Sequence, residues 1–319
     1  MTRMQSSLYS VLRVLLTTAL LIAGTSFTTA SAQSDTITFG APPWPGITVK
    51  SEVARQILLD LGYDAEVMNA STQAIMKGIA KKQIQVDMAL WRPQHNELLD
   101  KAIDKGEAVA LTSNLRDALY TMAVPEYVWD AGVHSFRDLD RYADKFDHKM
   151  YGLEAGMAGN EIMWKAIKSD TYSLSGWKVV PSSEPGMLAQ VQHSMDKKEW
   201  IVFQGWQPHW MNVEFDMKYL EDPEGIWGGP STIYTVTYPE FPDENPNVAR
   251  FLRQMQVPKE VQSRWILEYS HNDRPADEVA REWIGDNRGL VAQWLDGVKA
   301  ADLKRPAADV VAAAMAHSQ

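Results

Sequence analysis

The sequence has 319 residues, with 31 Lys or Arg and 41 Asp or Glu, so its formal net charge is −10. An acidic chain does not fit a protein whose main partner is nucleic acid, because phosphate binding needs a basic surface. Cysteine is absent, which excludes disulfides, thiol catalysis, cysteine-based metal centres and an acylated cysteine anchor. The length allows one large domain or two medium ones.

The first segment of the chain is typical of a secretory signal peptide. Arg3 and Arg13 flank the start of an apolar run over residues 14–23, and residues 30–32 form an A-x-A cleavage sequence. The apolar run is shorter than the roughly 20 residues that span a bilayer; an N-terminal membrane anchor is the alternative. We therefore predict a cleaved signal peptide over residues 1–32 and a mature protein in the periplasm.

Strands and helices alternate along the mature chain, and this pattern predicts an α/β fold with a parallel sheet. The predicted strands cover residues 37–40, 65–68, 86–90, 119–124, 149–153, 177–180 and 200–203. The predicted helices cover residues 49–61, 71–80, 138–146, 160–167 and 185–197. Residues 247–317 are predicted to be nearly all helical, with breaks at 286–289 and 305–306.

Four aromatic residues lie at or just past the ends of predicted strands, namely Trp44, Trp91, Tyr120 and Trp206. In an open α/β sheet, ligands bind beyond the carboxyl ends of the strands. Aromatic rings that converge there form an electron-rich box that attracts a methylated onium group. Core packing is the alternative for each Trp. Trp227, in a glycine-rich loop, is a further candidate for a wall of the box.

Six parts of the sequence stand out together: Trp44, VDMALW at 86–91, VPEYV at 124–128, YGLE at 151–154, GWQPHW at 205–210 and KYLEDP at 218–223. With them the chain resembles the periplasmic substrate-binding proteins of ABC importers for glycine betaine, choline and related osmolytes. The resemblance implies a two-lobed periplasmic-binding-protein fold with a ligand cleft between the lobes, and an aromatic box made by the four aromatic residues. It places lobe I at residues 35–118 and 226–319, and lobe II at residues 119–225.

Two positions depart from the choline-binding branch of that family. The branch has an Asp where this sequence has Gly46 and an Asn where this sequence has Met157. Gly46 and Met157 are predicted to lie at the ligand-binding site, and they lack the polar side chains that the choline-binding branch has there. The resemblance therefore favours trimethylamine N-oxide, glycine betaine or dimethylsulfoniopropionate over choline as the solute. It also implies an ABC permease as the membrane partner, closure of the lobes over the solute, a monomer, and no cofactor.

The polar end of such a solute needs its own partner, and the sequence leaves several candidates open. Arg92 could hold a carboxylate, with a surface ion pair to Glu97 as the alternative. His209 could donate a hydrogen bond, or be a helix-start or surface histidine. Glu154 could bind an N-oxide, or be a solvated carboxylate. The backbone amides of residues 45–47, at a helix start, could hold an anionic end.

Other functions have less support in the sequence. There is no G-x-S-x-G, H-E-x-x-H, P-loop or G-x-G-x-x-G motif, and the seven histidines include no i, i+4 pair. We predict no enzyme and no metal site; a hydrolase is a remote alternative. A ligand-binding adaptor for a chemoreceptor or sensor would share the same binding chemistry and stays open. The acidic residues Glu240, Asp243 and Glu244 lack EF-hand spacing and are interpreted as a solvated loop.

Overall fold

The computed structural model describes residues 36–316, and the predicted signal peptide lies outside the described residues. From Thr36 onward the chain forms one compact unit. The strands are β1 (Ile37–Ala41), β2 (Ala65–Asn69), β3 (Val86–Arg92), β4 (Val109–Pro125), β5 (Lys149–Tyr151), β6 (Lys178–Val180), β7 (Phe203–Gln207), β8 (Met217–Tyr219) and β9 (Ser231–Thr237).

Seventeen helical segments accompany these strands in the described part of the chain. They are α2 (Pro45–Asp60), α3 (Thr72–Ala80), α4 (Asn96–Asp104), α5 (Glu126–Asp130), α6 (Phe136–Leu139), η1 (Asp140–Phe146), α7 (Ala158–Lys168), η2 (Thr171–Ser173), α8 (Glu184–Lys197), α9 (Met211–Glu214), α10 (Phe241–Glu244), α11 (Pro246–Gln254), α12 (Lys259–Ile266), η3 (Leu267–His271), α13 (Ala276–Asp286), α14 (Arg288–Trp294) and α15 (Ala307–Ala316). None of the helices over residues 36–316 is long and apolar enough to cross a membrane.

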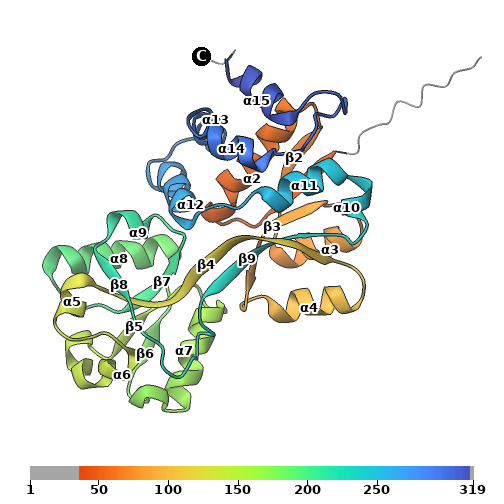
Figure 1. Cartoon of the computed structure of the whole chain (residues 1–319). Coiled ribbons are helices and arrows are strands. Elements are labelled where there is room, and N and C mark those ends of the chain that lie inside the picture. Colours follow the sequence, from red (N-terminus) through yellow and green to blue (C-terminus); the bar gives the residue numbers. More distant parts are fainter. Residues whose placement is uncertain (1–35, 317–319) are drawn as a thin grey trace, which may run out of the picture. The chain divides into compact units, whose positions relative to one another are not determined.

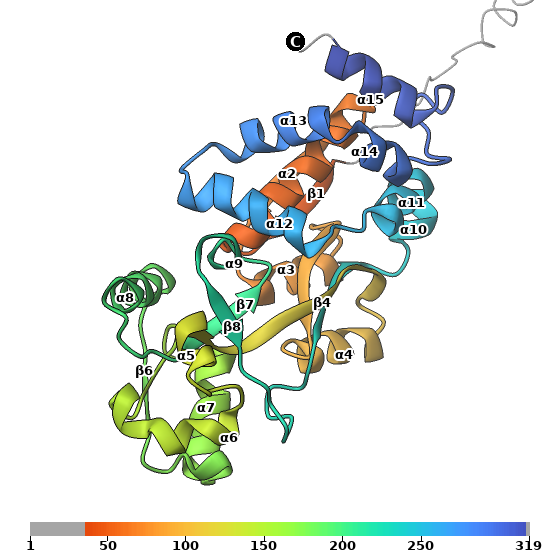
Figure 2. The ribbon, with the colours of Figure 1, turned by 60° about the vertical axis from the view of Figure 1, so that its left-hand side comes forward.

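The strands lie in the order β2-β1-β3-β9-β4-β7-β5-β6, with β8 also on β4 (Figure 1). Strand β4 pairs with β9 up to Ala118 and with β7 from Leu119. We call the β2-β1-β3-β9-β4 part sheet A and the β4-β7-β5-β6 part, with β8, sheet B. Figure 2 shows β4 running from one part into the other. Sheet A carries lobe I and sheet B carries lobe II; the exact lobe boundaries predicted from the sequence stay a prediction.

The prediction of an α/β fold is confirmed, but the prediction of a parallel sheet is only partly right. β1 runs parallel to β2 and β3, and β5 runs parallel to β6 and β7. β9 is antiparallel to both of its neighbours, and β7 is antiparallel to β4. The register of β4 against β9 shifts three times, including between Leu115 and Ala118. Such bulges bend a strand and increase its twist, so β4 can leave one sheet and enter the other.

Each lobe has its own apolar core. The lobe I core joins β1, β3 and α2 to the C-terminal helices, and α12, α13 and α15 all contact α2. Within it Trp283 packs edge-on against Trp265 at 4.8 Å and stacks on Trp294 at 5.5 Å between ring centroids. The predicted helical tail is confirmed, but its breaks are only partly right. The first predicted break is a single residue, because α14 begins at Arg288, and the second extends over residues 295–306. Residues 255–258 and 272–275 also interrupt the helices.

Sequence reasoning missed β9, the first half of β4, and α4, and it took residues 138–146 for one regular helix. Strand β9 is hard to recognise because Ser231, Thr235 and Thr237 are fully buried polar residues. Residues 140–146 form a 3₁₀ helix after α6, with non-helical dihedral angles at Tyr142.

A buried polar cluster lies between α2 and sheet A. Lys50 Nζ donates to Asn114 Oδ1 at 2.9 Å. Asn114 Nδ2 donates to Thr235 Oγ1 at 3.0 Å. Asp87 accepts one backbone N–H at 2.7 Å, while its Oδ2 has no partner within residues 36–316. Burial lowers the pKa of Lys50 to about 7 and raises the pKa of Asp87 to about 7, against the attraction between the two charges.

Replacing Asp87 with Asn is expected to change the pH dependence of the free energy of unfolding. The Asp87 carboxyl keeps its proton up to about pH 7 in the folded protein, whereas its ordinary pKa is 3.8. Between these values the folded state binds more protons than the unfolded state, so this group makes the protein less stable as the pH rises. Urea unfolding at about pH 5 and about pH 7 measures the difference.

The wild type is expected to lose more unfolding free energy between the two pH values than the Asp87→Asn variant. Asp104→Asn is the control, because Asp104 is exposed at the end of α4. The same pH dependence in all three proteins would contradict the assignment.

Candidate ligand-binding site

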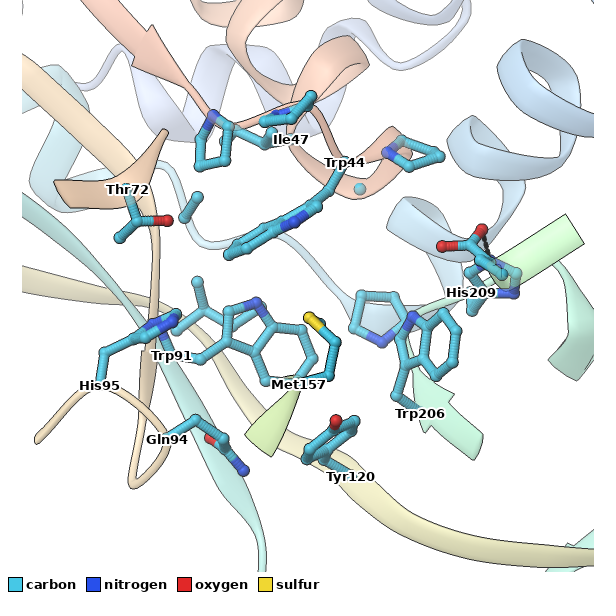
Figure 3. A pocket seen from close by; sticks show the side chains of 18 of the residues that line it. Trp44, Ile47, Thr72, Trp91, Gln94, His95, Tyr120, Met157, Trp206 and His209 are labelled. Atoms are coloured by element: carbon cyan, nitrogen blue, oxygen red, sulfur yellow. Dashed lines mark hydrogen bonds and ion pairs between the residues drawn. The ribbon is translucent and has the colours of Figure 1, made fainter. Parts of the chain in front are cut away.

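A cavity of about 500 Å³ is lined by residues of both lobes. Four of its lining residues are the predicted aromatic residues Trp44, Trp91, Tyr120 and Trp206, all half-buried. Figure 3 shows their rings around one space, with the side chain of Met157 among them. The structure therefore brings these four residues together, and their role in binding a solute stays a prediction.

The wall in lobe II is set by strand pairing. Tyr120 of β4 lies directly opposite Trp206 of β7, so both side chains lie on the same face of sheet B. The Tyr120 hydroxyl accepts the Gly159 N–H at 3.2 Å and donates to Gln204 Oε1 at 3.5 Å. Trp227 packs edge-on against the Tyr120 ring at 5.3 Å. Burial raises the pKa of Tyr120 to about 12, so the phenol stays neutral and its ring is held in place.

The wall in lobe I is held by a histidine that sequence reasoning missed. Trp91 lies near the end of β3, opposite Ile233 of β9. Its backbone N–H donates to His95 Nδ1 at 3.3 Å. The His95 ring is parallel to the Trp44 indole, with ring centroids 6.0 Å apart and 2° between the planes. Burial lowers the pKa of His95, so the neutral ring links the Trp44 indole to the backbone of Trp91.

Trp44 is positioned by the start of α2, which begins earlier than the predicted residue 49. Trp44 is the N-cap and Pro45 the first helical residue, a position that suits proline because its missing N–H has no partner in the helix. Gly46 lines the cavity with its backbone. A Cβ at Gly46 would lie 3.4 Å from Gln262 Nε2 and 3.6 Å from Ile266 Cδ1. The missing side chain therefore points toward α12.

Two neighbouring residues of α12 connect the walls of the two lobes. Gln262 Nε2 donates to the Gly46 carbonyl at 2.7 Å, next to the lobe I wall. Ser263 Oγ accepts the backbone N–H of His209 at 3.2 Å, next to the lobe II wall. The His209 ring meets the Trp206 ring edge-on at 4.7 Å. The distance between Trp44 and Trp206 is therefore braced by one helix.

Three of the ten predicted ligand-binding positions do not line the cavity. Arg92 forms an ion pair with Asp100, not with the Glu97 named as its alternative. Glu154 is exposed, just before the turn that leads into α7. Trp227 is 3% exposed and belongs to the lobe II core. It supports Tyr120 from behind and is not a wall of the cavity itself.

His209 lines the cavity, but both of its ring nitrogens are already used. Nε2 lies 3.0 Å from Glu184 Oε1, and Nδ1 accepts the Met211 N–H at 3.2 Å. The residue is 2% exposed, so the surface alternative is wrong. The helix-start alternative fits, because His209 lies two residues before Met211, the first residue of α9, and its ring accepts that residue's N–H. Burial lowers the pKa of His209, while the Glu184 carboxylate acts in the opposite direction. The side chain therefore has no free donor for a solute, and it orients Trp206 and Glu184.

Polar groups that sequence reasoning missed also line the cavity: Lys50, Thr72, Gln94, His95, Glu184 and Gln262. Helices α2, α3, α7 and α8 all begin at the cavity, and a helix N-terminus favours negative charge. At α8 the first turn already contains a negative charge, the Glu184 carboxylate. The sequence could have indicated these helix starts, because each of the four helices follows a strand and so begins at the edge of a sheet where ligands bind.

In the region from residue 36 to 316, no group of three or more His, Asp or Glu side chains is arranged to hold a metal ion. The acidic residues near α10 have another partner. Lys82 Nζ lies 3.3 Å from carboxylate oxygens of both Glu240 and Glu244.

Comparison with known proteins gives four sequence relatives, including one from Chromohalobacter salexigens and one from Listeria monocytogenes. The chain is 37% identical over 135 residues to the uncharacterized protein ORF1 of Chromohalobacter salexigens, a match that covers 42% of this chain and 87% of that protein. It is 31% identical over 159 residues to the glycine betaine/carnitine transport binding protein of Listeria monocytogenes, covering 50% of this chain and 53% of the relative. The match thus spans about half the length of the Listeria protein.

Two solved structures are similar over nearly their whole length. One is an ABC-transporter choline binding protein in complex with choline, with a TM-score of 0.76, 29% identity, and coverage of 88% of this chain and 98% of that one. The other is lactococcal OpuAC in its closed-liganded conformation with glycine betaine, with a TM-score of 0.69, 26% identity, and coverage of 81% and 98%.

A family model described as the substrate binding domain of ABC-type glycine betaine transport systems matches residues 35–286. This match covers most of the chain, so the protein belongs to that family and is a two-lobed substrate-binding protein, not an enzyme.

Proposed function

We propose that this protein binds a small methylated onium solute, of the glycine betaine, trimethylamine N-oxide or dimethylsulfoniopropionate kind, and delivers it to an ABC permease. One observation carries the proposal: four half-buried aromatic rings, from both lobes, face one cavity. Rings buried only for their apolar area would lie inside the cores. The choline and glycine betaine complexes among the similar structures support the same class of ligand.

The aromatic rings can supply most of the required affinity. Each ring face contributes about 0.5–2 kcal/mol to binding of a desolvated cation. Four faces then contribute roughly 2–8 kcal/mol, whereas a micromolar site needs about 8 kcal/mol. One or two polar contacts to the other end of the solute make up the difference, so the polar end decides both the affinity and the choice of solute.

The two positions that differ from the choline-binding branch also differ here in chemistry. Gly46 presents only backbone, and its carbonyl is already bonded to Gln262. Met157 presents an apolar thioether to the cavity. Neither offers a side-chain acceptor for the hydroxyl of choline. We therefore favour solutes whose polar end accepts hydrogen bonds.

Closure of the lobes is part of the proposal. A small methylated solute fills only a fraction of a cavity of about 500 Å³, so tight enclosure needs the walls to approach each other. Hinge closure stabilised by the ligand is the usual motion of two-lobed binding proteins. The moving bodies would be residues 35–118 with 226–319, and residues 119–225, except that Trp227 packs in the lobe II core and would move with lobe II. The protein would be a periplasmic monomer released by signal-peptide cleavage.

Titration of the mature protein with four solutes tests the proposed function. We expect saturable changes in tryptophan fluorescence with one or more of glycine betaine, trimethylamine N-oxide and dimethylsulfoniopropionate, because Trp44, Trp91 and Trp206 face the cavity. Choline is expected to bind at least about tenfold more weakly, equivalent to roughly 1.4 kcal/mol. Tight choline binding would overturn the choice of solute, and no response to any of the four would overturn the proposed function.

Replacing Trp206 or Trp91 with Ala is expected to weaken binding of the preferred solute by at least about tenfold, because each change removes one ring face of about 0.5–2 kcal/mol and opens the box to water. Far-UV circular dichroism should be unchanged. Trp164→Ala is the matched control, because Trp164 lies on α7 and does not line the cavity. Retained affinity in both wall variants would show that the rings do not hold the solute.

Ser263→Ala is expected to weaken solute binding by about threefold to tenfold, equivalent to a net hydrogen bond of roughly 1 kcal/mol. The change leaves the buried His209 N–H unpaired, which loosens the loop that follows Trp206. Binding of the solute must then order this loop, and that cost lowers the affinity. Ser270→Ala is the control, because Ser270 bonds only within its own helical segment, to Ile266 O at 2.9 Å. Isothermal titration calorimetry of both variants measures the effect, and equal affinities would contradict the brace.

A further inference from the structure

Thr72 presents a hydroxyl that stays accessible from the cavity. Its side chain is 7% exposed and lines the cavity. Figure 3 shows its hydroxyl oxygen pointing into the cavity, on the side of the Trp44 ring. Within residues 36–316 this hydroxyl has no hydrogen-bond partner. A solute that enters the cavity can therefore reach this hydroxyl and accept a hydrogen bond from it.

The backbone around Thr72 offers further donors at the same place. Thr72 is the first residue of α3, and Ser71 is its N-cap, with Ser71 Oγ accepting the Ala74 N–H at 3.3 Å. The N–H groups of Thr72 and Gln73 belong to the first turn and have no partner inside the helix. The first turn carries no acidic residue, so nothing neutralises the positive end of this nine-residue helix.

One carboxylate lies beside the aromatic box. The Lys50 ammonium is not available to a solute, because Lys50 is 1% exposed and its Nζ donates to Asn114. Glu184 lines the cavity from lobe II and is bonded to the histidine that contacts Trp206. An onium group in the aromatic box therefore lies near a carboxylate on one side. Only donors and positive partial charges are offered at α3.

We propose that the N-terminus of α3 is the subsite for the carboxylate of the solute, with the Thr72 hydroxyl and the first-turn N–H groups as donors. The inference rests on the proposed function, because it assigns the second end of a solute whose onium end occupies the aromatic box. A carboxylate has two oxygens that accept several hydrogen bonds, whereas the hydroxyl of choline also needs an acceptor. The preferred solute is thus a methylated onium carboxylate.

Two substitutions at Thr72 and two ligands test this subsite. Thr72→Val keeps the shape and removes the hydroxyl, and Thr72→Ser keeps the hydroxyl. A hydrogen bond to a charged group corresponds to a change of about tenfold or more in affinity. We expect Thr72→Val to weaken glycine betaine binding by at least that factor, and Thr72→Ser to stay within about threefold of the wild type. Tetramethylammonium, which has an onium group but no carboxylate, should bind both variants as it binds the wild type.

Thr38→Val is the matched control. Thr38 is a buried threonine of lobe I whose hydroxyl donates to Glu66 at 2.9 Å, and it does not line the cavity. Calorimetry gives the affinities, and thermal unfolding checks that each variant is folded. The inference is overturned by unchanged glycine betaine affinity in Thr72→Val, by equal losses in Thr72→Val and Thr72→Ser, or by equal losses for glycine betaine and tetramethylammonium.

Failure of the proposed function gives a different result. In that case the wild-type protein itself binds neither ligand, before any substitution is made. If only the α3 subsite is wrong, the wild-type protein still binds glycine betaine, and its affinity does not depend on the Thr72 hydroxyl.

Discussion

The site depends on one strand that pairs with two partners. β4 forms sheet A with β9 and then sheet B with β7. Because side chains alternate between the faces of a strand, its register against β7 decides which residues face the cavity. In the observed register Tyr120 lies opposite Trp206. A shift of β4 by one residue would turn Tyr120 toward the other face while Trp206 kept its place, so the lobe II wall would lose one of its two rings.

The polar contacts around the cavity mostly hold aromatic rings in place. The Tyr120 hydroxyl, the His95 ring and the His209 ring all have partners in the protein. Burial keeps these groups in their neutral forms, as the directions of their pKa shifts indicate. Neutral groups near the rings do not compete with a cationic solute. If α3 holds the carboxylate as proposed, recognition of the two ends of the solute is divided between aromatic faces and a helix terminus.

Much of the site could be predicted from the sequence, because strand ends are visible as transitions from apolar runs to loops. Trp91 follows an apolar run directly, and that alone places it at the edge of a sheet where ligands bind. The polar residues were harder to assign. Arg92 is adjacent to Trp91 in sequence, but neighbouring residues of a strand point to opposite faces, and Arg92 pairs with Asp100 outside the cavity. Thr72 was recognised only as part of a helix start, because its hydroxyl's lack of a partner is visible only in three dimensions.

The contacts of α12 with both lobes have a consequence for the width of the cavity in this protein. Gln262 and Ser263 are consecutive, so their side chains leave the helix in directions about 100° apart, and each reaches a different lobe. An insertion of one residue before α12 would rotate both side chains away from their partners at once. Loops that carry the rings can vary in sequence while the spacing between lobes is kept. In this conformation the rotation of α12 about its axis therefore sets the spacing of the cavity walls, whereas the side chains that line the cavity set which solute fits.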